Sequence, residues 1–322
     1  MKNEYDLLKV FAILLVVLGH ITILYRGDGS LGYLITNFIT SAIYIFHMPL
    51  FVSLSGAIYS IGYENGKYLH FIPFINNKIK RLIVPFIFVG VFFLAPTLVI
   101  FKMTNMSFTE CVGNILFCCG SERHLWYLPA LFWIFIIVWV FTKSKIKVEI
   151  MFILSVLIAV ICSLFLKFDF FALWNAIQYL PYFILGMLIN NYKTIRNSLM
   201  LFVGVFIFFT TAIILWFSDI SLLDNICRIL LPCSIVVMLV SVFRWLSRMI
   251  NIRSVIWISI LKYSFAIYLF HVIIIYVMYN CICMYLPVYV MIPVTFISAM
   301  IISSCLAYII RKLNLQFIIG EN

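Results

Sequence analysis

The chain has 322 residues, of which 66% are hydrophobic and only 10% are charged. A soluble domain carries about 25% charged residues, so this composition excludes a soluble globular protein and predicts a surface that faces lipid. The formal net charge of +11 does not indicate nucleic-acid binding, because the basic residues lie scattered between apolar segments and form no single patch.

Apolar segments recur along the whole chain. A membrane-spanning helix needs roughly 20 largely apolar residues, and the sequence contains ten such segments. They run at 6–25, 38–62, 82–101, 125–142, 148–166, 171–190, 198–217, 223–245, 263–280 and 286–310. The sequence therefore predicts an all-α, polytopic membrane helix bundle, with one domain over residues 1–322 and no fused soluble domain.

The lysine and arginine residues predict the orientation of this bundle. Of the 22 basic residues, 17 fall in segments on one side of the predicted helices and 5 on the other side. Cytoplasmic segments of membrane proteins are enriched in lysine and arginine. We therefore expect the richer side, which includes both termini, to be cytoplasmic.

The first predicted helix carries two ionisable residues, which are costly in lipid and so indicate function. Lys9 lies one turn from the inner end, and His20 lies near the outer end. At about 100° and 1.5 Å per residue, the two side chains face within roughly 20° of each other and lie roughly 16 Å apart along the helix. This stripe suits a ligand such as coenzyme A, with phosphates at one end and a thioester at the other.

Two further features occur around the second and third helices. His47 lies within the outer half of the second helix, and Lys78, Lys80 and Arg81 precede the apolar core of the third. Lys78 and Arg81 are three residues apart, so we expect them to share a helix face and to hold one phosphorylated ligand. Anchoring at the membrane surface is the alternative, and we favour it for Lys80.

Between the third and fourth helices, apolar residues from Phe108 onwards recur at i, i+4, i+7 and i+8. This spacing predicts a short amphipathic helix on the outer membrane surface. The three cysteines in this stretch allow a disulfide on an oxidising side. No cysteine spacing in the chain indicates a metal site.

The remaining candidates lie in the fourth and ninth helices. His124 is at the outer mouth of the fourth helix, followed by Trp126, and His271 lies in the outer half of the ninth. We predict that these three residues bind the substrate. The alternatives are that each histidine hydrogen-bonds a neighbouring helix and that Trp126 is an interfacial anchor.

Five segments resemble the membrane acyltransferase family 3 proteins in order and spacing. These segments are residues 5–20, 46–56, 78–85, 124–128 and 263–271. The family comprises multi-pass enzymes that O-acylate bacterial surface sugars. The resemblance implies that His20 is the catalytic histidine, paired with the basic residue at position 9, and that Lys78 and Arg81 hold the acyl-CoA donor. Lys9 and Lys78 stand where many members have arginine.

From these features we expect an O-acetyltransferase in the inner membrane of a bacterium, with acetyl-CoA as the acyl donor and a surface glycan or its lipid-linked precursor as the acceptor. His20 would act as general base or become transiently acylated. Asp6 and His47 are candidates for orienting groups or proton relays. The rival is a transporter or flippase for a lipid-linked glycan, although the sequence lacks the paired repeats typical of that class.

Overall fold

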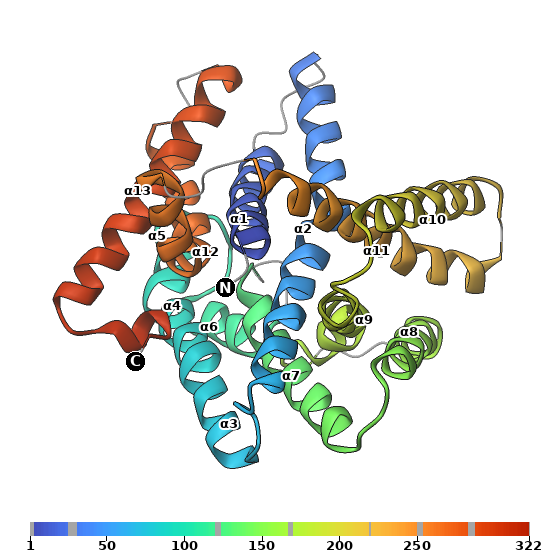
Figure 1. Cartoon of the computed structure of the whole chain (residues 1–322). Helices are drawn as coiled ribbons and strands as arrows, with labels where there is room; N and C mark the ends of the chain where they lie inside the picture. The colour runs from blue at the N-terminus through green and yellow to red at the C-terminus, as the bar shows by residue number, and fades with distance from the viewer. Residues whose placement is uncertain are drawn as a thin grey trace.

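A computed structural model describes residues 3–24, 31–119, 124–166, 170–218, 220–249, 254–282 and 287–321. All regular elements in these ranges are helices (Figure 1). Within them, nine helices are long and apolar enough to cross a membrane. The chain is therefore a multi-pass membrane protein, and the predicted all-α bundle is confirmed.

The bounds of the helices are as follows. The longer helices are α1 (Asn3–Leu24), α2 (Leu31–Glu64), α7 (Tyr127–Lys143), α8 (Val148–Phe165), α9 (Leu173–Asn191), α10 (Asn197–Phe217), α11 (Ser221–Leu246), α12 (Val255–Cys281) and α13 (Val288–Lys312). The shorter elements are α3 (Phe71–Lys78), η1 (Ile79–Ile83), α4 (Val84–Val89), η2 (Gly90–Leu94), α5 (Ala95–Ile100), α6 (Phe108–Phe117), η3 (His124–Trp126) and η5 (Gln316–Ile319).

All ten predicted segments are helical, but α9 is not among the nine helices that meet the length and hydropathy requirements in the described residues. Polar residues such as Asn175, Gln178 and Asn190 lower its hydropathy. Its side chains from Leu180 to Met187 are all buried, because α9 packs against α2, α7 and α8. The protein surrounds α9, so this helix needs less apolar surface than its neighbours.

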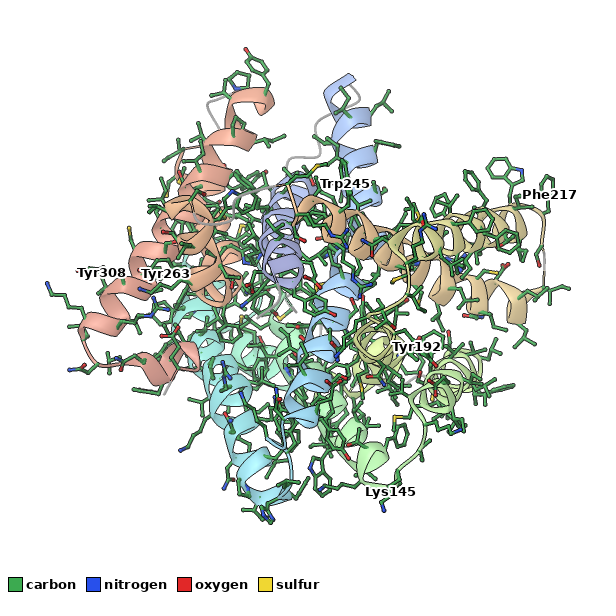
Figure 2. All side chains as sticks on the ribbon, in the orientation of Figure 1. Lys145, Tyr192, Phe217, Trp245, Tyr263 and Tyr308 are labelled. Atoms are coloured by element: carbon green, nitrogen blue, oxygen red, sulfur yellow. The ribbon has the colours of Figure 1, made fainter. Side chains whose placement is uncertain are left out.

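Large apolar side chains cover the outside of the bundle (Figure 2). Phe217, at the end of α10, is 79% exposed, and Trp245 and Tyr308 project from α11 and α13. A soluble protein would rarely expose so many large apolar residues in continuous patches. These side chains form the surface that the composition predicts for contact with lipid.

The third predicted helix begins earlier than expected, at Phe71, and includes two π-helical turns, η1 and η2. Each turn ends one residue before an X-Pro pair, at Pro85 and Pro96. A proline has no N–H group and its ring crowds the carbonyl four residues earlier, so the helical hydrogen-bond ladder widens ahead of it. The first of these turns contains Arg81.

The predicted short amphipathic helix is α6. It begins with a capping box, in which Ser107 and Glu110 bond each other's backbone N–H groups. The hydrogen bonds that the Glu110 carboxylate accepts from the backbone N–H and the hydroxyl of Ser107 lower the pKa of Glu110. Cys111 and Ile115 face the protein, whereas Phe108 is largely exposed. Of the predicted apolar stripe, Ile115 is buried and Val112 and Leu116 pack against the core, whereas Phe108 at the start of α6 remains exposed.

Helices α2 and α9 cross at close range through two glycines. A Cβ atom on Gly56 would lie 1.8 Å from the carbonyl oxygen of Phe183, and a Cβ on Gly186 would lie 1.8 Å from that of Ser53. Small residues let helix backbones approach in this way. The crossing fixes the segment of α2 that supplies one wall of the cavity described below.

Gly186→Ala is expected to lower stability by about 1–3 kcal/mol or more, because the backbone carbonyl of Ser53 cannot yield to the added methyl group. The measurement is the melting temperature of the protein in detergent. Gly113→Ala is the matched control, since a Cβ at Gly113 meets nothing within 4 Å. Equal melting temperatures for the two variants would show that the helices separate at little cost.

Candidate active site

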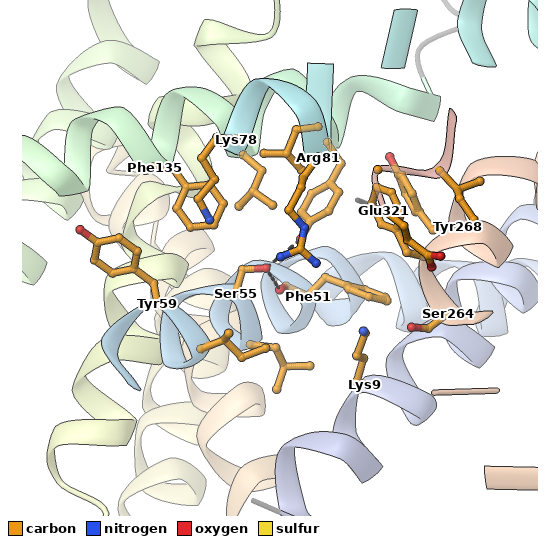
Figure 3. Close-up of a pocket in the computed structure, with 18 of the residues that line it drawn as sticks. Lys9, Phe51, Ser55, Tyr59, Lys78, Arg81, Phe135, Ser264, Tyr268 and Glu321 are labelled. Carbon is orange, nitrogen blue, oxygen red and sulfur yellow. Dashed lines mark hydrogen bonds between the residues drawn. The ribbon is translucent and has the colours of Figure 1, made fainter. Parts of the chain in front are cut away.

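A cavity of about 350 Å³ lies at the end of the bundle where Lys9 is found (Figure 3). Helices α1, α2, α3, α7 and α12, the turn η1, Tyr68 and residues 319–321 line it. Four of its lining residues are basic and one is acidic. These are Lys9, Lys78, Arg81, Lys262 and Glu321.

The structure brings together the three basic residues that the sequence predicted to bind the acyl donor. Lys9 comes from α1, Lys78 from the end of α3, and Arg81 from η1, and all three line the cavity. Lys80 is not one of the lining residues and is exposed. An excess of positive charge around one cavity favours an anionic ligand carrying more than one charge.

Aromatic rings enclose the ammonium group of Lys78. Its Nζ lies 3.4 Å from the ring centre of Phe135, 5.4 Å from that of Tyr68 and 5.5 Å from that of Phe74. Cations are attracted to the faces of aromatic rings, so these rings hold Lys78 at the cavity wall. Arg81 is exposed and its guanidinium group points into the cavity (Figure 3).

Several hydroxyl groups complete the lining. The Ser55 hydroxyl lies 3.0 Å from that of Tyr127, and Tyr68 stacks on Tyr59 with ring centres 4.8 Å apart. Burial raises the pKa of Tyr68, so its phenol stays neutral and can donate a hydrogen bond to an anionic ligand.

Three of the predicted histidines form a cluster. The ring centres of His20 and His271 are 5.1 Å apart, those of His124 and His271 are 6.2 Å apart, and those of His20 and His124 are 6.5 Å apart. They come from α1, α12 and η3, which are distant in sequence. The structure therefore gathers these side chains at one point of the bundle.

The hydrogen bonds of His271 determine its tautomer. Its Nδ1 lies 2.9 Å from the carbonyl oxygen of Ile267 and 2.8 Å from that of Tyr268. A carbonyl only accepts, so Nδ1 carries the proton and Nε2 of the neutral ring is an acceptor. The buried Nε2 atoms of His271 and of His124 have no hydrogen-bond partner among the described residues. The cluster thus has unused hydrogen-bonding capacity at the Nε2 atoms of His124 and His271.

His47 lies next to this cluster and is linked to it by Tyr44. The Tyr44 ring centre is 4.8 Å from that of His47 and 6.3 Å from that of His20. His47 is buried, and its Nδ1 lies 2.8 Å from the carbonyl oxygen of Ile43. This bond fixes the same tautomer as in His271, with Nε2 as the acceptor.

Tyr268 joins the cavity to the histidine cluster. Its side chain lines the cavity, and its hydroxyl donates a hydrogen bond of 3.1 Å to the carbonyl oxygen of His124. Its own carbonyl accepts the bond from His271, and the two rings lie 6.2 Å apart. Tyr268 therefore contacts both the cavity and the histidine cluster, and its ring lies 5.5 Å from that of Tyr127, which also lines the cavity.

Two predicted site residues neither line the cavity nor belong to the histidine cluster. Asp6 is half-buried, does not line the cavity, and has one carboxylate oxygen without a partner among the described residues. Trp126 packs against Tyr179, with ring centres 4.9 Å apart. The roles assigned to Asp6 and Trp126 stay predictions.

Several cavity residues carry no signal in the sequence that would mark them as functional. Phe135 and Tyr68 belong to apolar or turn segments, and only the fold places them around Lys78. Residues 319–321 follow the last predicted helix and carry no recognisable motif. In the described part of the chain, no group of three or more histidine, cysteine, aspartate or glutamate residues is arranged to hold a metal ion.

Comparison with known proteins gives one match. A family model described as an acyltransferase domain matches residues 2–312. This match extends from α1 to the end of α13 and includes every predicted site residue. No curated protein and no solved structure matches the chain.

Proposed function

Because this chain belongs to the acyltransferase domain family, we propose that it transfers an acetyl group from acetyl-CoA to a hydroxyl group of a bacterial cell-surface glycan or of its lipid-linked precursor. The family and the multi-pass helical fold make the protein a membrane acyltransferase. The acetyl donor, the glycan acceptor and the roles of individual residues belong to our proposal.

One observation carries this proposal: a cavity with four basic residues lies beside a cluster of three histidines. The phosphates of coenzyme A carry several negative charges, which Lys9, Lys78 and Arg81 would neutralise. A donor held at these cations would extend its thioester arm past Tyr268 toward His20. Lys9 and His20 lie on one face of α1, which supports a single ligand that reaches both.

In this proposal His20 acts as the general base. Its imidazole takes the proton from the acceptor hydroxyl, and the oxygen attacks the carbonyl carbon of the thioester. The C–S bond then breaks, and the coenzyme A sulfur leaves with the proton that His20 had accepted. His20 is half-buried, whereas His271 is fully buried, so His20 has the better access to an acceptor.

The orientation belongs to the same proposal. The excess of lysine and arginine on one side of the bundle supports cytoplasmic termini, which would open the donor cavity toward cytoplasmic acetyl-CoA. His20 would then lie in the outer half of the inner membrane, where a glycan acceptor is found. The acetyl group would cross most of the bilayer on the arm of its donor.

The test separates acyl transfer from glycan transport. Purified protein in detergent is supplied with acetyl-CoA and an acceptor glycan, and free thiol is measured. We expect acceptor-dependent release of coenzyme A together with acetylation of the glycan, which mass spectrometry would detect. Glycan translocation in vesicles without any thioester cleavage would favour the flippase and overturn the proposal.

A further inference from the structure

Residues 316–321, which follow α13, fold back against the donor cavity. Ile318 and Ile319 are 4% and 1% exposed, and Phe317 packs against Phe88 of α4 with ring centres 6.0 Å apart. Ile319, Gly320 and Glu321 line the cavity. This segment is therefore a packed wall of the cavity.

Gly320 touches the backbone of Arg81. Its φ angle is +64°, and a Cβ atom would lie 2.6 Å from the carbonyl oxygen of Arg81 and 3.2 Å from its Cα. Only glycine combines this left-handed backbone with so close an approach. Pro85, four residues after Arg81, has no N–H group to donate to the Arg81 carbonyl. The Arg81 carbonyl therefore cannot accept the usual hydrogen bond from the residue four positions later, and Gly320 packs against it.

An ion pair holds the segment in this position. Arg311 of α13 donates hydrogen bonds to both carboxylate oxygens of Glu321, at 2.7 and 2.5 Å. The guanidinium group also lies over the Tyr263 ring, 4.7 Å from its centre. Paired bonds of this kind fix both distance and direction. The pair ties Glu321, the neighbour of Gly320, to two long helices.

We propose that residues 316–321 position Arg81 for the phosphates of the donor, with Gly320 as the contact and Arg311–Glu321 as the clamp. This inference rests on the proposed function of the cavity. Gly320, Arg311 and Glu321 are positioning residues, because they act through Arg81. Without this role, an acidic residue such as Glu321 would only weaken the binding of an anion by the surrounding cations. Its pairing with Arg311 gives it a structural role there.

The first test compares two glycines in purified, detergent-solubilised protein, with coenzyme A as the ligand. Gly66 has φ +72° and nothing within 4 Å of an added Cβ, so Gly66→Ala introduces the same backbone strain without a collision. We expect Gly320→Ala to raise the Kd for coenzyme A by about tenfold or more, and Gly66→Ala to change it by less than about twofold. Equal affinities for the two variants would overturn the inference.

The second test distinguishes positioning from simple charge. If Glu321 acted only through its charge, Glu321→Arg would add positive charge to the cavity and tighten coenzyme A binding. If it positions Arg81, Glu321→Arg repels Arg311, releases the segment and weakens binding. Arg311→Glu should also weaken binding, and the double exchange should restore it because the pair reforms with reversed charges. Tighter binding by Glu321→Arg would overturn the inference.

Coenzyme A binding by the wild-type protein distinguishes a failure of the proposed function from a failure of the positioning role. If it does not bind coenzyme A at all, the proposed function of the cavity fails, and the inference fails with it. If it binds and Gly320→Ala binds equally well, only the positioning role fails. Circular dichroism and melting temperature of each variant show whether the bundle remains folded when its affinity is compared.

Discussion

His20→Ala is expected to reduce turnover by roughly 10²–10⁴-fold, the usual scale for the loss of a general acid–base group. The reduction would be larger if His20 is transiently acylated. The affinity for coenzyme A should change little, because Lys9, Lys78 and Arg81 line the cavity on the far side of Tyr268. The measurement is coenzyme A release under saturating donor, together with the Kd for coenzyme A.

His47→Ala is the control for lost packing. His47 is buried next to the cluster, and Tyr44 contacts both its ring and that of His20. A histidine that only holds helices together would give a variant with a lower melting temperature and near-normal turnover. That pattern at His20, in protein that stays folded, would contradict the mechanism.

Arg81→Ala is expected to raise the KM for acetyl-CoA by roughly 10–100-fold, because a hydrogen bond to a charged group contributes about 1.5–3 kcal/mol. The guanidinium group points into the cavity, so under the proposed function its loss would remove a direct contact with the donor (Figure 3). Turnover at saturating donor should fall much less. Initial rates over a range of acetyl-CoA concentrations separate the two quantities.

Lys80→Ala is the matched control, since Lys80 lies one residue from Arg81 but does not line the cavity. It removes the same charge from the same turn. Similar small effects at both positions would show that these residues only anchor the helix at the membrane surface, and would remove the phosphate role from Arg81.

The sequence predicted the helices well because long apolar segments leave little choice of structure in a bilayer. It also predicted that Lys9 and His20 share a stripe, since helix geometry alone relates them. The positions of the histidines along their helices predicted that they lie in the same half of the bundle. That they meet at one point depends on the packing of α1 against α12. The lower hydropathy of α9 distinguishes this helix from the nine spanning helices in the described residues, but only the packing shows that other helices surround it.

The environment of the basic motif was less predictable. We expected Lys78 and Arg81 to share an ordinary helix face, but the π turn η1 begins between them and the aromatic rings of two other segments surround Lys78. The π turn follows from the nearby Pro85, whereas Phe135 and Tyr68 come from segments that only the fold brings next to Lys78. The wall that Gly320 supplies comes from the far end of the chain, and no residue near Arg81 indicates it.

The length of α2 has a consequence for the surrounding membrane. With 34 residues, it extends over roughly 51 Å at 1.5 Å per residue, whereas a hydrocarbon core is about 30 Å thick. Such a helix must tilt, bend or leave the hydrocarbon, and the extent depends on bilayer thickness. Ser55 lines the cavity, Tyr44 contacts His20, and Pro49 lies between them, where a helix bends most readily. A mismatch between the length of α2 and the thickness of the bilayer therefore acts on both the cavity and the histidine cluster. Reconstitution in lipids of increasing acyl length would change the rate of catalysis without any change in the protein.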